Sequence, residues 1–140
     1  MRYEKSCGFV AYTNAPDGRR YLIIRSLDGE YGFPKGHVEG SETEHETAVR
    51  ELKEETNAEV TIIPGFRRQI EYAFPNEPGV MKRTVYFVGE VLPGEILCRE
   101  GEVAEAAFLS FEKAYELLSF ADTKNILKEA DAFLHSIAAQ

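Results

Sequence analysis

The sequence concentrates acidic residues in one short segment. Of the 24 Asp and Glu residues in the chain, seven are glutamates between Gly36 and Glu55, where only Arg50 and Lys53 oppose them. This segment of 20 residues therefore carries −5 of the formal net charge of −8. Carboxylates held close together raise one another's proton affinity unless a cation neutralises them. The segment must therefore fold either with a solvated acidic face or around bound cations.

Residue spacing helps to distinguish these two interpretations. Glu51, Glu54 and Glu55 stand at i, i+3 and i+4, which places three carboxylates on one face of a helix. One turn earlier on the same stripe stands the uncharged Thr47, so the acidic cluster begins at Glu51. Carboxylate ligands without a cluster of His or Cys favour Mg²⁺ or Mn²⁺ over zinc. For the triplet alone, the alternative is an exposed acidic face stabilised by its basic neighbours.

Hydrophobic periodicity and turn residues divide the chain into predicted strands and helices. Strands are predicted over residues 6–12, 21–25, 60–63, 66–74, 85–91 and 106–109, and helices over 43–56, 111–118 and 123–137. Residues 29–40 are predicted to form a loop, and the Pro-Gly pair at 64–65 is predicted to interrupt a strand. This order of elements predicts an α/β fold in which helices pack on the faces of a mixed sheet.

The first predicted helix has a signal at each end. Ser41, followed three residues later by Glu44, resembles a capping box at its start. Asn57 follows the helix, and asparagine tolerates the left-handed backbone that is common just past a helix end. The acidic triplet is therefore expected in the last turns of this helix.

Length, charge and cysteine content restrict the class of protein. A chain of 140 residues is predicted to fold as one domain, residues 1–140. A net charge of −8 repels polyanions, which argues against a nucleic-acid partner. The N-terminus lacks a signal peptide's apolar core and no apolar run approaches the ~20 residues of a membrane span, so we expect a soluble, cytoplasmic protein. Cys7 and Cys98 lack metal-ligand spacing and are predicted to be small buried residues in a reducing compartment.

A longer pattern surrounds the acidic triplet and argues against the solvated face. It runs from Gly36 through five residues to Glu42, then through seven residues to the stretch Arg50-Glu51-Leu52-Lys53-Glu54-Glu55-Thr56-Asn57. This pattern resembles the signature of the Nudix hydrolases, and every charged position of that signature is filled. The departures are at the helix exit, where Asn57 replaces glycine and Ala58 replaces a larger aliphatic residue. The resemblance implies the Nudix fold, a mixed β-sheet sandwiched between α-helices with a loop-helix-loop metal motif.

The resemblance also implies a metal site. One or more Mg²⁺ or Mn²⁺ ions would be held by the backbone carbonyl of Gly36 and the carboxylates of Glu51, Glu54 and Glu55. A further ligand or base would come from a distant loop, where Glu102 aligns best and Glu100 and Glu105 are the alternatives.

Further roles within the motif follow from the same resemblance. Glu51 is the first candidate for the catalytic base. Arg50 would orient the carboxylates and pair with Glu42, and a purely structural ion pair is the alternative for these two residues. The reaction would be in-line attack by a metal-bound water on a phosphorus of a polyphosphate chain.

The flanks of the motif resemble the asymmetric diadenosine tetraphosphate hydrolases, whose products are ATP and AMP. Residues 33–39, Phe-Pro-Lys-Gly-His-Val-Glu, and residues 62–68, Ile-Ile-Pro-Gly-Phe-Arg-Arg, carry this similarity, which extends over residues 6–134. Residues 101–108 depart from it, because several relatives have a His on each side of the loop glutamate and an Arg-Trp just beyond.

Two groups of substrate-binding residues are implied by this second resemblance. Cationic side chains would hold the polyphosphate, first Lys35, His37 and Lys82, and secondarily Arg67, Arg68 and Arg83. Aromatic side chains would stack on adenine, first Tyr72 and Phe133, with Tyr86 as a third option. The plainer interpretation is surface charge for the lysines and arginines. For Phe133 it is core packing, because Ile126, Phe133 and Ile137 follow helical spacing.

Alternative functions keep the same fold. An RNA 5′-triphosphate end, a deoxynucleoside triphosphate or a diphosphoinositol phosphate could replace the dinucleotide, although RNA ends and diphosphoinositol phosphates favour a broader basic surface. A non-catalytic nucleotide-binding module is a different class, against which the complete set of Glu51, Glu54 and Glu55 argues. The sequence therefore favours a metal-dependent pyrophosphohydrolase whose partner is a small dinucleoside polyphosphate.

Overall fold

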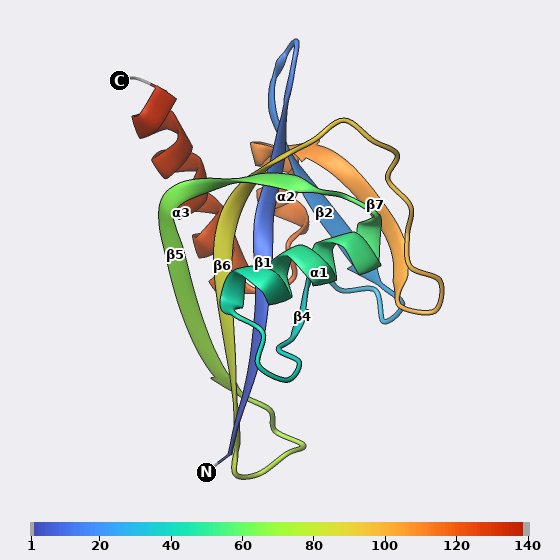
Figure 1. The fold of residues 1–140 in the computed structure, drawn as a ribbon, viewed down its shortest axis with the longest axis vertical. Helices are drawn as coiled ribbons and strands as arrows, with labels where there is room; N and C mark the ends of the chain where they lie inside the picture. Colours follow the sequence, from blue (N-terminus) through green and yellow to red (C-terminus); the bar gives the residue numbers. More distant parts are fainter. Residues whose placement is uncertain (1, 139–140) are drawn as a thin grey trace.

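A mixed seven-stranded sheet lies at the centre of the computed structural model, which describes residues 2–138 (Figure 1). The strands are β1 (Arg2–Ala15), β2 (Gly18–Ser26), β3 (Tyr31–Gly32), β4 (Lys35–His37), β5 (Val60–Ala73), β6 (Val80–Val91) and β7 (Val103–Ser110). The helices are α1 (Glu44–Thr56), α2 (Phe111–Leu117) and α3 (Ala121–Ala138). β1 pairs in parallel with β6, and the other pairs are antiparallel. The predicted α/β fold with a mixed sheet is confirmed.

Helices cover both faces of the sheet because the side chains of β1 alternate between two cores. Cys7 and Phe9 pack on one face with Ala48 and Leu52 of α1. Val10 packs on the other face, where the C-terminal part of the chain contributes the buried residues Ala114, Leu118, Ile126, Leu127, Ala130 and Leu134. Figure 1 shows α1 in front of the sheet and α2 and α3 behind it. The acidic helix is therefore anchored through its apolar side.

The segment predicted to be a loop, residues 29–40, contains the short strands β3 and β4. β4 pairs with β1, where Cys7 lies opposite Gly36. Gly8 permits this approach, because a Cβ atom there would lie 2.3 Å from the Pro34 carbonyl oxygen. β4 pairs with residues far away in the sequence, and β3 has only two residues, so the pattern within the segment itself does not reveal these strands.

The break predicted at residues 64–65 is wrong, because β5 continues through it from Val60 to Ala73. The register against β6 shifts between Ile63 and Arg68, so a bulge accommodates the Pro-Gly pair. Gly65 has φ +102°, a conformation that glycine adopts without strain. β6 and β7 also begin earlier than predicted, at Val80 and Val103.

The capping box of α1 uses different residues from those predicted. Thr43 is the N-cap, and its Oγ1 accepts a hydrogen bond from the Glu46 N–H over 3.1 Å. Glu46 Oε1 in turn accepts from the Thr43 N–H over 2.8 Å. The prediction of Ser41 and Glu44 is therefore two residues too early. At the other end, Asn57 has φ 63°, which confirms the predicted left-handed exit.

The two terminal helices lie close to their predicted bounds, although α3 begins two residues early, at Ala121. Of the predicted apolar stripe, Ile126 is buried and Phe133 is partly buried, whereas Ile137 is 37% exposed, so only part of the stripe reaches the core. Within residues 2–138, no helix is long and apolar enough to cross a membrane.

The two cysteines lie in different surroundings. Cys7 is buried in β1, as predicted, and burial raises the pKa of its thiol to about 11. Cys98 is exposed, so the prediction of burial is wrong for this residue. It lies in the irregular segment between β6 and β7, and connecting segments of this kind run over the surface.

Candidate active site

β4 and the second half of α1 lie against each other. The Lys35 N–H donates to Glu55 Oε1 over 2.8 Å. A Cβ atom on Gly36 would lie 2.0 Å from the carboxyl carbon of Glu51, so this position has no room for a side chain. The structure therefore brings together the backbone of Gly36 and the carboxylates of Glu51 and Glu55, as the motif requires.

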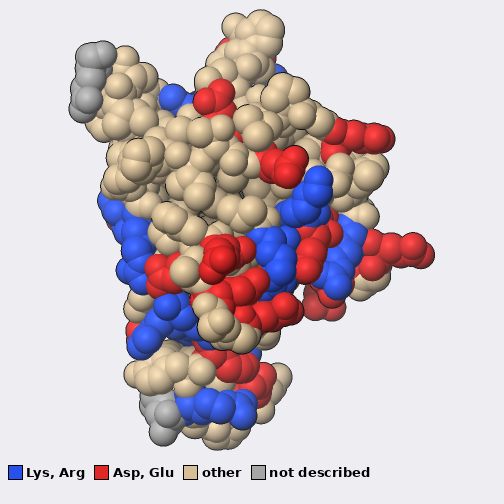
Figure 2. All heavy atoms as spheres, viewed as in Figure 1, with Lys and Arg blue, Asp and Glu red and all other residues tan. Residues whose placement is uncertain are grey.

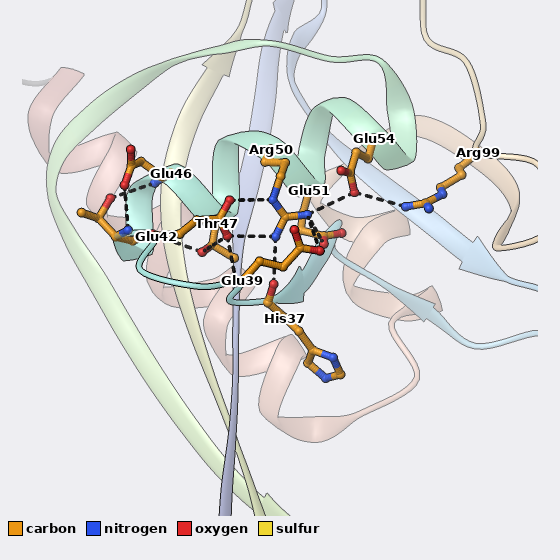
Figure 3. Close-up of polar contacts among 10 residues, drawn as sticks. His37, Glu39, Glu42, Glu46, Thr47, Arg50, Glu51, Glu54 and Arg99 are labelled. Atoms are coloured by element: carbon orange, nitrogen blue, oxygen red, sulfur yellow. Dashed lines mark hydrogen bonds and ion pairs between the residues drawn. The ribbon is translucent and has the colours of Figure 1, made fainter.

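Arg50 ties the carboxylates of the motif together (Figure 3). Its Nε and Nη2 donate to the two carboxylate oxygens of Glu42 over 2.7 and 3.0 Å, and Nη2 also donates to the His37 carbonyl oxygen over 2.9 Å. Its Nη1 donates to Glu51 over 2.8 Å and to Glu54 over 3.2 Å. The hydrogen bonds from Arg50 lower the pKa of Glu42 to about 2. The expected pair of Arg50 with Glu42 is thus present.

Burial disfavours the charged form of two glutamates in the motif. It raises the pKa of Glu55 to about 7, although the hydrogen bond from the Lys35 N–H opposes this shift. Burial also raises the pKa of Glu51, opposed by the hydrogen bond from Arg50. Glu54 is more exposed than either. Partly buried carboxylates of this kind are stabilised in their charged form by a nearby cation.

The segment between β6 and β7 adds a further carboxylate. The Arg99 N–H donates to the Glu55 carbonyl oxygen over 2.9 Å, which fixes this segment against the end of α1. Arg99 Nη1 then lies 3.2 Å from Glu54 Oε2 and 3.6 Å from Glu102 Oε2. Glu105 pairs instead with an arginine of β2. The structure therefore places Glu102 beside the motif, together with Arg99, which the sequence analysis did not single out.

The donor chemistry of this cluster fits a hard divalent cation. Its donors are carboxylate oxygens and a backbone carbonyl. Glycine at position 36 lets the main chain approach the Glu51 carboxylate. Within residues 2–138, no three His, Cys, Asp or Glu side chains are already converged in a metal-binding arrangement. Glu51 and Glu54 accept hydrogen bonds from arginine side chains, and Glu55 accepts one from a backbone N–H group.

A cavity of about 600 Å³ adjoins the carboxylates. Its lining combines Glu55, Glu102 and Lys35 with aromatic side chains from the sheet strands, from the segments that follow β3 and β5, and from the junction of α2 and α3, namely Tyr31, Phe33, Tyr72, Phe74, Tyr86 and Phe120. Phe120 is 52% exposed and Phe74 is 42% exposed, so both present apolar surface to a ligand. Polar and apolar groups converge here in the manner of a small-molecule site.

The predicted aromatic residues have different positions. Tyr72 lines the cavity and meets Phe74 edge to face, with ring centroids 5.8 Å apart. Tyr86 lines it as a buried residue and packs against Phe33. Phe133 does not line it but packs on Phe66, with ring centroids 5.5 Å apart, so core packing describes this residue. The structure therefore offers Phe120 where the sequence analysis expects Phe133.

Of the predicted cationic residues, Lys35 alone lines the cavity. The His37 side chain is exposed and points away from Arg50 (Figure 3). The others are held in ion pairs, with Lys82 bound to Glu4, Arg67 to Glu44, Arg68 to Glu129 and Arg83 to Glu71. Lys82 Nζ nevertheless lies 4.7 Å from the ring centroid of Phe74, so this residue is close to the cavity lining. Figure 2 shows acidic and basic side chains interleaved over α1 and its surroundings. The phosphate-binding role expected for Lys82 and the three arginines stays a prediction.

The comparisons with known proteins decide the family. The sequence model of the NUDIX domain matches residues 7–130. The chain belongs to the Nudix family. The domain match and the relatives identify it as a Nudix hydrolase that acts on pyrophosphate bonds.

Among its relatives are asymmetrical bis(5′-nucleosyl)-tetraphosphatases. The mouse protein is 36% identical over 125 residues, and the pig protein is 34% identical over the same length. Each alignment covers 85% of this chain and 83% of the relative. The fold is similar to that of the Caenorhabditis elegans Ap4A hydrolase in a binary complex, with a TM-score of 0.86, 24% identity and coverage of 95% of this chain and 98% of that one.

Proposed function

We propose that this Nudix hydrolase cleaves a dinucleoside polyphosphate, with diadenosine tetraphosphate as the preferred substrate and ATP and AMP as products. The observation that supports this most strongly is the cavity of about 600 Å³, in which aromatic side chains and the carboxylate cluster share one lining. The mouse and pig relatives, which are named as asymmetrical tetraphosphatases, favour the same substrate.

The enzyme would depend on Mg²⁺ or Mn²⁺. The groups available to hold the ion are the Gly36 carbonyl oxygen and the carboxylates of Glu51, Glu54, Glu55 and Glu102. When bound, the ion lowers the pKa of water and neutralises negative charge that develops on the phosphoryl group. The oxygen-only donor set and the close approach of Gly36 to Glu51 support this assignment.

Within the chain, the carboxylates and Arg50 have distinct tasks. Water attacks one phosphorus in line, the anhydride bond to the leaving oxygen breaks, and a glutamate accepts the proton of the water. Glu51 is one candidate for this base, and Glu55 is a second, because it lines the cavity. Arg50 would position Glu51 and Glu54 through its two Nη1 contacts.

The other end of the cavity would hold adenosine. Tyr72, Phe74 and Phe120 are aromatic lining residues that are not fully buried, as is Tyr31. Stacking of a base on an aromatic ring is worth about 1–3 kcal/mol. Lys35, the lining cation, would bind a phosphate between the stacked base and the carboxylates.

The test is a product analysis with purified protein, Mg²⁺ and a substrate panel. The panel contains dinucleoside polyphosphates, deoxynucleoside triphosphates, ADP-sugars and 5′-triphosphate RNA. We expect diadenosine tetraphosphate to give equal amounts of ATP and AMP, and EDTA to abolish turnover. Faster cleavage of another class would reassign the substrate, and a lack of turnover throughout the panel would favour a nucleotide-binding module.

A variant pair tests the role of the motif. Glu51→Gln should reduce turnover about a hundredfold or more, in line with contributions of general bases. Glu59→Gln is the matched control, because its carboxylate is exposed and contacts only Lys53, at 4.0 Å, within residues 2–138. Near-normal activity of Glu51→Gln would contradict the assignment of Glu51 as base or essential metal ligand.

A further inference from the structure

Arg99 lies between carboxylates that come from two different parts of the chain. Its Nη1 is 3.2 Å from Glu54 Oε2 on α1 and 3.6 Å from Glu102 Oε2 on its own segment. Both carboxylates belong to the set that we propose to hold a divalent cation. The guanidinium of Arg99 and that cation would therefore compete for the same oxygens.

Arg50 contacts the same cluster but is held much more firmly. Its side chain is 22% exposed, and it also donates to both oxygens of Glu42 and to the His37 carbonyl oxygen. The side chain of Arg99 is 42% exposed, and within residues 2–138 its guanidinium contacts two carboxylates, both through Nη1. Exposed ion pairs of this kind contribute little to stability. Arg99 can therefore leave its partners easily, whereas Arg50 cannot.

The backbone around Arg99 is fixed, so only its side chain needs to move. The Arg99 N–H donates to the Glu55 carbonyl oxygen over 2.9 Å. The Arg99 carbonyl oxygen accepts from the N–H groups of Glu102 and Val103 over 3.2 and 3.0 Å. These bonds hold the start of the side chain at the end of α1 while its far end is exposed.

We infer that Arg99 is an internal counter-ion of the carboxylate cluster, which a divalent cation displaces and which lowers the affinity of the site for that cation. Without the cation, Arg99 offsets the repulsion between Glu54 and Glu102 and keeps Glu102 beside α1. Once displaced, its guanidinium is free at the rim of the cavity that Glu102 lines, where an anionic polyphosphate would be its next partner. The inference rests on the proposed metal dependence and makes Arg99 a positioning residue.

The test measures Mn²⁺ binding, which requires no turnover. Wild type, Arg99→Gln and Arg25→Gln are titrated with Mn²⁺ at low ionic strength, and free Mn²⁺ is followed by electron paramagnetic resonance. Arg25 is the matched control, because it also forms an exposed ion pair, with Glu105 at 3.3 Å, and its substitution by Gln removes the same charge. We expect Arg99→Gln to bind Mn²⁺ about three- to tenfold more tightly than wild type, from the modest strength of exposed pairs, and Arg25→Gln to bind within about twofold.

Thermal unfolding supplies a second readout. In EDTA, Arg99→Gln should have a lower Tm than wild type, because Glu54 and Glu102 then repel each other. Saturating Mn²⁺ should reduce this difference in Tm. Equal Mn²⁺ affinity of wild type and Arg99→Gln, or weaker binding by the variant, would overturn the inference and leave the proposed function standing. Failure of the wild type to bind Mn²⁺ would overturn the proposed metal dependence and the inference with it.

Discussion

Gly36 of β4 lies against the carboxylate of Glu51. A Cβ atom on Gly36 would lie 2.0 Å from the Glu51 carboxyl carbon and 2.2 and 2.4 Å from its two oxygens. Real atoms do not approach this closely, so any side chain at position 36 must push the carboxylate or the strand aside. At the scale of the single residue, the position of the Glu51 carboxylate therefore depends on the absence of a side chain at Gly36.

Gly36→Ala should lower kcat/KM for the proposed dinucleotide substrate about a hundredfold, because displacements of about 1 Å at a catalytic group have effects of that size. Steady-state kinetics of the variant and of Gly94→Ala check this. Gly94 is the matched control, since the nearest atom to an added Cβ is 4.0 Å away. Wild-type kinetics for Gly36→Ala would show that this approach does not constrain the site.

Sequence spacing identified the motif residues but missed Arg99 and Phe120, and the physical reason is the same for both. The helical period relates Glu51, Glu54 and Glu55 through local geometry alone. Arg99 meets Glu54 only because a long irregular segment folds back over α1. The sequence does contain a signal for Phe120, because a large apolar residue between two predicted helices has no helical face on which to pack. Its position in the cavity depends on the sheet and could not be predicted from this signal.

At the scale of the element, α1 is secured by hydrogen bonds at its ends and by ion pairs along its first turn. Thr43 and Glu46 satisfy each other's backbone N–H groups at the N-terminus. Glu44 binds Lys5 of β1 at 2.6 Å and Arg67 of β5 at 2.8 Å. These contacts fix the start of the helix, and with it the direction in which Glu51, Glu54 and Glu55 project.

Thr43→Ala should reduce the free energy of unfolding by about 1 kcal/mol, the usual effect of losing an N-cap side chain. Ser41→Ala, at the position that the sequence pattern suggested, should change it little. Urea denaturation of both variants separates the two assignments. A larger loss in Ser41→Ala than in Thr43→Ala would contradict the capping geometry.

The ion pairs of Glu44 predict how stability depends on pH. Hydrogen bonds from Arg67, with help from Lys5, lower the pKa of Glu44 to about 2 from an ordinary value of 4.5. Because the folded-state pKa is lowered, this stabilisation is present above pH 4.5 and is lost as the pH falls towards 2. Glu44→Gln should therefore cost about 1 kcal/mol at pH 7, and the difference from wild type should shrink in acid. A difference that stays constant with pH in denaturation experiments would rule out this ionic contribution.

At the scale of the whole molecule, the sheet and the C-terminal helices jointly form one cavity. Tyr72 and Phe74 come from the end of β5 and its following turn, whereas Phe120 comes from the junction of α2 and α3. The carboxylates come from α1 and from the β6–β7 segment. The order of strands and helices could be predicted from the sequence, but this convergence depends on β1 pairing with β6, which no local pattern encodes.

The two phenylalanines of the C-terminal region should have opposite effects. Phe120→Ala should raise KM for the dinucleotide about tenfold with little change in Tm, because it removes an exposed stacking surface. Phe133→Ala should lower stability by about 3 kcal/mol with little change in KM, because it leaves a void beside Phe66. Steady-state kinetics and thermal unfolding of both variants distinguish the two roles. A raised KM in Phe133→Ala together with a lowered Tm in Phe120→Ala would instead support Phe133 as the residue that stacks on adenine.

The parallel pairing of β1 with β6 also bears on how the protein is made. Residues Arg2 to Tyr12 align with residues Val80 to Glu90. A nascent chain must therefore grow by nearly eighty residues before its first strand meets this neighbour, and such non-local pairing slows folding. α1 packs on Val85 and Phe87 of β6 as well as on β1, so its docking surface is complete only when β6 has left the ribosome. Residues 36–55 are synthesised before β6 and Glu102 after it, so the candidate site can form only once the chain has grown past Glu102.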